Sequence, residues 1–92
     1  MAKRAQIFKK QAFHFKAPAA KQVLLAGDFT DWQHRAIPMH KGSDGNWTAA
    51  IGLAPGVHYY LFIVDGQWCD DPECPSRVPN PHGGQNMVRQ VV

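Results

Sequence analysis

Residues 57–68 read VHYYLFIVDGQW, and this stretch does most to decide the fold. Its first eight residues fall into two alternating sets, as the side chains of a β-strand do. The Asp-Gly pair that follows is typical of a two-residue hairpin turn. Neither alternating set is polar, although one face of a sandwich sheet normally meets water. Loops or a terminal segment therefore cover the second face, or it is an exposed binding surface, and both can hold over different parts of the strand.

Other short apolar segments surround this strand, at 12–15, 22–29, 46–53 and 86–92. Most are rich in β-branched or aromatic residues, and clusters of Gly, Pro, Asp and Asn separate them. No helical period continues for ten residues. The spacing predicts an all-β fold, a β-sandwich of short antiparallel strands. The longest break, 69–85, exceeds the usual loop length, and such loops in compact domains are often functional.

The chain has 92 residues, which predicts a single domain with a thin core. Apolar residues make up 45% and charged residues 18%, which is typical of a globular domain and not of disorder. Much of the positive charge lies in the first ten residues, MAKRAQIFKK. We therefore expect a basic N-terminal leader at 1–11 and one domain at 12–92. The net charge of +3 is mild, so we expect no nucleic-acid partner.

The sequence contains no apolar run of the roughly 18–20 residues that span a bilayer, and no signal-peptide pattern at its start. We therefore expect a cytoplasmic protein without a membrane partner. Cys69 and Cys74 are too few for a disulfide scaffold.

Catalytic residues are not indicated. Ser43 and Ser76 both lie among turn residues, outside any nucleophile-elbow pattern. The carboxylates Asp70, Asp71 and Glu73 suggest a glycosidase pair, but such pairs need opposing walls of a cleft about 5–10 Å apart. Turn formation before a proline explains them better. We predict a non-catalytic protein.

Metal and cofactor sites are not indicated either. The five histidines lack the spacing of a ligand set, and one C-x4-C without a second pair is no zinc signature. The glycines mark hairpins, and no phosphate-binding loop pattern appears. We predict no metal and no cofactor.

Aromatic side chains near turns remain as candidates for binding. Trp32 ends the turn-like stretch AGDFTDW, and Trp68 follows the turn of the hairpin at 65–66. Trp47 begins the alternating segment NWTAAI, which predicts a core position. Tryptophan is highly buried on average, so for Trp32 and Trp68 the residues alone favour packing over binding and leave both open.

The segments FHFKAPAAKQVLLAGDFTDW, GNWTAAIGLAPGVHYYLFIVDGQWCDDP and PNPHGGQNMVRQV together resemble carbohydrate-binding module family 48. That family includes the glycogen-binding domain of AMP-activated protein kinase β subunits and the early-set N-terminal domains of branching enzymes and isoamylases. The resemblance runs from Ala12 to Val91. It implies an immunoglobulin-like, early-set sandwich that binds α-1,4-linked glucan without catalysis.

The resemblance also implies site residues. Trp32 and Trp68 correspond to the two tryptophans that stack on sugar rings. Leu61 stands where glycogen-binding members carry a lysine, and it offers apolar contact instead of a hydrogen-bond donor. The family's asparagine before the last strand matches Asn86 or, with a shift of one residue, Gln85.

Pro81 is the nearest counterpart of an apolar residue in the same loop. Lys41 and His34 are further candidates for polar contacts.

Two hypotheses follow. The first is a carbohydrate-binding module for glycogen, starch-like polymer or maltooligosaccharide. The second is a protein-interaction module, in which the strand face formed by Tyr59, Leu61 and Ile63 docks a glucan-metabolising enzyme or a second copy of the chain.

Overall fold

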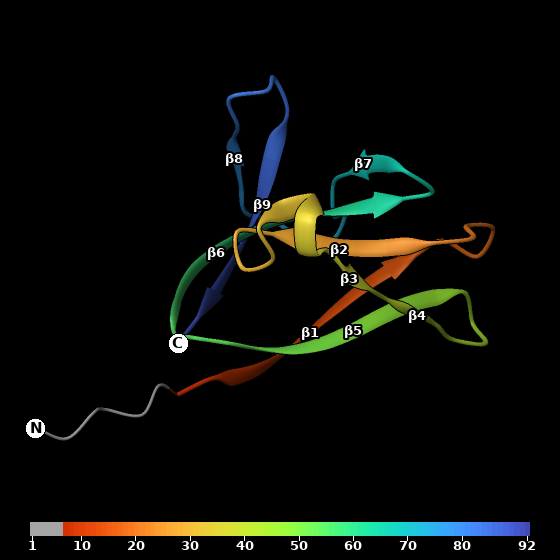
Figure 1. Ribbon diagram of the computed structural model, residues 1–92, viewed down its shortest axis with the longest axis horizontal. Coiled ribbons are helices and arrows are strands. Elements are labelled where there is room, and N and C mark those ends of the chain that lie inside the picture. The colour runs from red at the N-terminus through yellow and green to blue at the C-terminus, as the bar shows by residue number, and fades with distance from the viewer. Residues whose placement is uncertain (1–6) are drawn as a thin grey trace, which may run out of the picture.

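The computed structural model describes residues 7–92, which form two antiparallel β-sheets and one short 3-10 helix (Figure 1). The smaller sheet has the strand order β1-β5-β4, formed by β1 (Lys9–Lys16), β5 (Asn46–Leu53) and β4 (His40–Lys41). The larger sheet has the order β3-β2-β6-β9-β8, with β7 also paired to β6. Its strands are β3 (Ile37–Pro38), β2 (Val23–Gly27), β6 (Gly56–Val64), β9 (Gln85–Val91), β8 (Arg77–Pro79) and β7 (Gln67–Cys69). The predicted all-β sandwich of short antiparallel strands is confirmed.

The core lies between the two sheets. Alternation places Phe13 and Phe15 of β1 on the inner face, where Phe13 meets Tyr60 at 4.9 Å and Phe15 meets Phe62 at 4.9 Å between ring centroids. Tyr60 and Phe62 belong to β6, so these contacts join the sheets. Trp47 of β5 is buried, and its indole Nε1–H donates to the Ala17 carbonyl oxygen at 2.9 Å. Its predicted core position is confirmed.

The central strand β6 has a buried inner face and a partly covered outer face. One edge pairs with β2, while the other pairs first with β9 and then with β7. On the outer face Leu61 and Ile63 are each 8% exposed, whereas Val57 is 49% exposed. Trp68 of β7 pairs with Ile63, so both side chains lie on this outer face. The second face is therefore covered over one part of the strand and exposed over another, and a binding role for the exposed part stays a prediction.

The strand boundaries differ from the predicted ones mainly at the ends. The segment expected at 22–29 ends at Gly27, and the break at 69–85 contains β8. β1 begins at Lys9, so the boundary expected after residue 11 falls inside a strand that pairs with β5 from residue 9 onward. The first six residues of the expected leader lie outside the described part of the chain. Among residues 7–92, no helix has the length and apolar character needed to cross a membrane.

Candidate functional site

The turn after β2 positions Trp32. A Cβ added to Gly27 would lie 2.5 Å from the Tyr59 carbonyl oxygen and 2.6 Å from the Phe29 ring, so only glycine fits where β2 ends. Asp31 and Trp32 then adopt left-handed backbone conformations with φ of 52° and 55°. Such conformations cost about 1–3 kcal/mol each outside glycine and persist where surrounding contacts impose them. The 3-10 helix η1 (Trp32–Arg35) follows at once.

Thr30 supplies the contacts that hold this turn. Its side chain is 4% exposed, and its Oγ1 accepts the Gly27 N–H at 2.9 Å. The same hydroxyl lies 2.8 Å from the Trp32 carbonyl oxygen and 3.0 Å from the Gly27 carbonyl oxygen, so its single proton is donated to one of them. A buried hydroxyl therefore ties the Trp32 backbone to the end of β2.

The hairpin between β6 and β7 positions Trp68. Asp65 and Gly66 have φ of 48° and 83°, and this pair of left-handed residues is typical of a type I′ turn. The Asp65 carboxylate Oδ1 accepts the backbone N–H groups of Lys21 and Gln22, each at 2.9 Å, which fixes the turn against the start of β2. Trp68 follows on β7 and is 49% exposed. The hairpin therefore displays a large aromatic side chain on a rigid support.

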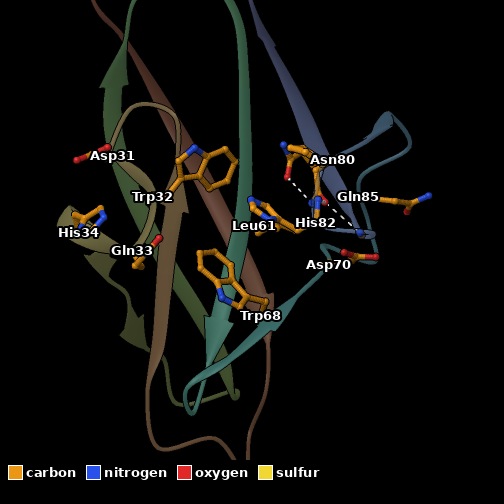
Figure 2. A pocket seen from close by; sticks show the side chains of 13 residues that line it. Asp31, Trp32, Gln33, His34, Leu61, Trp68, Asp70, Asn80, His82 and Gln85 are labelled. Carbon is orange, nitrogen blue, oxygen red and sulfur yellow. Dashed lines mark hydrogen bonds between the residues drawn. The ribbon is translucent and has the colours of Figure 1, made fainter.

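The two tryptophans meet on one side of the larger sheet. Their ring centroids are 6.5 Å apart and their planes meet at 62°, so they form two walls of one depression (Figure 2). Leu61 of β6 lines the same depression and contributes an apolar surface. The depression has a volume of about 770 Å³. Its lining also includes Asp31, Gln33, His34, Asp70, Asn80, Pro81, His82, Gly84, Gln85 and Asn86, and we call it the tryptophan groove.

The loop between β8 and β9 forms the polar side of the tryptophan groove. The Asn80 Oδ1 accepts the backbone N–H groups of His82 and Gly84, each at 3.0 Å. The Asn80 Nδ2 donates to the Asn86 Oδ1 at 3.1 Å. In Figure 2 the Gln85 side chain points away from both tryptophans. The sequence left Gln85 and Asn86 as alternatives for the family's asparagine. The hydrogen bond from Asn80 holds the side chain of Asn86.

A buried tyrosine-carboxylate pair anchors the segment before that loop. The Tyr60 hydroxyl donates to the Asp71 Oδ2 at 2.7 Å, and Asp71 is 7% exposed. Burial, together with the hydrogen bond to Asp71, raises the pKa of Tyr60 well above its usual range. The Arg77 guanidinium donates to the Asp71 carbonyl oxygen at 3.0 Å. Asp71 therefore has a structural role, which agrees with the turn explanation of this carboxylate cluster.

The groove combines flat apolar faces with hydrogen-bonding side chains at its rim. A pyranose ring needs this combination, because its C–H faces stack on aromatic rings while its hydroxyls point outward from the ring edge. Within residues 7–92, no group of three or more His, Cys, Asp or Glu side chains is placed to hold a metal ion.

Comparison with known proteins agrees with this chemistry. A family model described as the glycogen recognition site of AMP-activated protein kinase matches residues 10–92. The chain belongs to this family. The glycogen recognition family is a carbohydrate-binding module with a non-catalytic, all-β domain, which confirms the resemblance seen in the sequence.

Individual proteins are also similar in sequence to this chain. The chain is 39% identical over 71 residues to 5'-AMP-activated protein kinase subunit beta-1 of Sus scrofa, covering 77% of this chain and 55% of that protein. It is equally similar to the Homo sapiens beta-1 subunit, of which the match covers 25%. Subunit beta-2 of Mus musculus is 42% identical over 55 residues, which is 60% of this chain and 20% of that protein. The chain thus spans only part of the length of these curated relatives.

The structure brings the sequence-predicted residues of this glycogen recognition domain together. Trp32, Leu61, Trp68, Gln85 and Asn86 all line the tryptophan groove. His34 and Pro81 line it as well.

Other candidates differ from the sequence-based expectation. Lys41 lies elsewhere, since its Nζ donates to the Pro18 carbonyl oxygen at 2.6 Å. Sequence reasoning missed Asn80 and His82, although the Asn-Pro-His-Gly-Gly run at 80–84 was visible as a turn within a long loop.

Proposed function

We propose that this chain binds α-1,4-linked glucan, as glycogen, starch-like polymer or maltooligosaccharide, by stacking sugar rings on Trp32 and Trp68. The observation that carries the proposal is the placement of two indoles at 6.5 Å and 62° around one groove. A pair of inclined aromatic faces suits a chain whose successive sugar rings turn relative to one another. The family match to a glycogen recognition site supports the same ligand class.

Stacking by two indoles sets the expected strength of binding. Stacking of bases on aromatic side chains, a related interaction, contributes about 1–3 kcal/mol per ring. Two such faces in an open groove predict a dissociation constant between about 10 μM and the millimolar range. Tethering a catalytic partner to a polymer with many sites does not require tighter binding.

A maltoheptaose titration followed by tryptophan fluorescence tests the proposal. We expect a saturable change for the wild type and a loss of affinity of about five- to 150-fold for Trp68→Ala. Val57→Ala is the matched control, because Val57 is also 49% exposed but does not line the groove. Wild-type protein that gives no response at millimolar maltoheptaose contradicts the proposal.

The second candidate function is protein docking through the outer face of β6. Val57 is exposed and Tyr59 is half-buried on this face, and both are accessible to a partner or a second copy. Leu61 and Ile63 are largely covered, which leaves less apolar surface than the sequence pattern suggested.

Leu61→Lys separates the two candidates. If glucan binding is the function, the new ammonium group at the groove adds a donor to sugar hydroxyls and raises affinity for maltoheptaose. If docking is the function, the substitution dissociates an assembly that is visible as a concentration-dependent hydrodynamic radius.

The cellular role follows from the binding proposal. We propose that the module acts in the cytoplasm and brings a glucan-metabolising enzyme, or the other subunits of a kinase assembly, to the polymer. The printed name of its relatives, 5'-AMP-activated protein kinase subunit beta-1, supports a role within such an assembly. Sedimentation of cytosolic extract with glycogen is expected to carry the full protein into the pellet, and Trp68→Ala is expected to leave it in the supernatant.

A further inference from the structure

The tryptophan groove supplies apolar faces in excess of hydrogen-bonding groups at its centre. Leu61 has no polar side-chain atom, and each indole offers a single N–H donor. A sugar that enters the groove gives up water around its hydroxyls, and an unpaired hydroxyl costs free energy. The bound glucan therefore needs donors and acceptors from the sides of the groove.

The β8–β9 loop is built to provide them. Asn80 makes three side-chain hydrogen bonds within the loop region, to the His82 and Gly84 N–H groups and to the Asn86 amide oxygen. The Asn80 N–H also donates to the Gly84 carbonyl oxygen at 3.0 Å, which closes the loop on itself. Gly83 has φ of 87°, a conformation that glycine adopts without strain.

These bonds act on two side chains that line the groove. Because the Asn86 Oδ1 accepts from Asn80, the Asn86 NH2 group is turned to the opposite side as a donor. The imidazole of His82 is exposed and lines the groove, while its backbone is held by Asn80. Figure 2 shows His82 on the side of the groove where Asn80 lies, across from the loop that carries Trp32.

We propose that His82 hydrogen-bonds glucan hydroxyls and that Asn80 is the positioning residue that holds His82 and Asn86 ready for this contact. The inference rests on the proposed glucan-binding function and deepens it. A loop fixed before binding loses less conformational entropy when the sugar arrives, so Asn80 contributes to affinity by holding the loop. The polar side of the tryptophan groove, at 80–86, supplies the hydrogen-bonding groups that the apolar side chain of Leu61 lacks.

Four variants titrated with maltoheptaose test the inference. His82→Ala and Asn80→Ala are each expected to weaken binding about two- to tenfold, the range of one hydrogen bond. Asn80→Asp retains an acceptor for the His82 and Gly84 N–H groups but loses the donor to Asn86, so we expect it to recover part of the affinity lost in Asn80→Ala. The double variant with alanine at both positions is expected to lose less than the product of the two single losses, because Asn80 acts partly through His82.

Trp68→Ala in the same series separates this inference from the proposed function. If Trp68→Ala loses binding while His82→Ala and Asn80→Ala bind as the wild type does, glucan binding stands and the inference is overturned. An Asn80→Asp protein as weak as Asn80→Ala also overturns the positioning role. If the wild type does not bind, both proposals fail. The His82 side chain is exposed, so His82→Ala tests the contact even if Asn80→Ala perturbs the loop.

Discussion

Replacing Thr30 by valine removes one hydroxyl from the turn that presents Trp32 and keeps nearly the same shape. The lost hydroxyl accepts the Gly27 N–H at 2.9 Å and donates its proton to the carbonyl oxygen of Trp32 or Gly27. Thr30 is 4% exposed, so water has little access to replace these bonds. The substitution leaves the buried Gly27 N–H without its partner, whereas the Gly27 carbonyl oxygen still accepts the Thr30 N–H at 3.0 Å.

The expected loss of stability follows from the hydrogen bonds that the Thr30 hydroxyl makes. A buried polar group without a partner costs about 1–3 kcal/mol, and the added valine methyl recovers little of it because the site is already filled. For a domain of this size, each kcal/mol shifts the unfolding midpoint by about 4–8 °C. We therefore expect Thr30→Val to lower the free energy of unfolding by about 1–3 kcal/mol. The left-handed conformations at Asp31 and Trp32 also lose a restraint, so we expect weaker maltoheptaose binding.

Urea unfolding followed by circular dichroism measures the stability change, and the sugar titration measures the functional one. Thr30→Ser is the control, because it keeps the hydroxyl and loses only a methyl group. The reasoning is refuted if Thr30→Val is as stable as the wild type, or if Thr30→Ser is destabilised as much as Thr30→Val.

Two further predictions concern the fold. The pKa of Tyr60 is raised in the folded protein, so the folded state holds this proton more tightly than the unfolded chain does, and the stability gained is lost as pH rises above about 10. We expect the unfolding free energy to fall more steeply with pH in the wild type than in Tyr60→Phe, and the two slopes differ by up to about 1.4 kcal/mol per pH unit. Denaturation of both proteins between pH 9 and 11 measures this difference. Gly27→Ala forces a Cβ to within 2.5 Å of a backbone carbonyl oxygen and is expected to cost about 1–3 kcal/mol, whereas Gly84→Ala meets no atom closer than 3.5 Å and serves as its control. Equal unfolding midpoints for these two alanine variants contradict the packing argument.

Much of the fold follows from local pattern. The segment 46–53 places an apolar side chain at every second position from Trp47 to Leu53, and the predicted and observed strands coincide. The edge strands β3 and β4 have two residues each, too few to show any period. The 3-10 helix at Trp32 depends on left-handed residues held by the Thr30 hydroxyl, a local side-chain-to-backbone contact that no propensity of aspartate or tryptophan indicates.

Some residues of the candidate site were predicted from the sequence and others were not. The resemblance to a known family points to Trp32 and Trp68, and the structure places them around one groove. Asn80 and His82 were not predicted, because their roles depend on side-chain hydrogen bonds within a loop rather than on a motif. The buried pair of Tyr60 and Asp71 was equally hidden, since eleven residues separate a strand position from its partner in the following loop.

The most direct test of the account observes the three indole N–H groups by NMR during a maltoheptaose titration. Trp47 serves as an internal reference, because its N–H is bound to the Ala17 carbonyl oxygen in the core. Single tryptophan-to-phenylalanine variants assign the signals. We predict that the indole signals of Trp32 and Trp68 shift together with one dissociation constant while that of Trp47 stays in place. Stationary Trp32 and Trp68 signals at millimolar maltoheptaose would contradict the account.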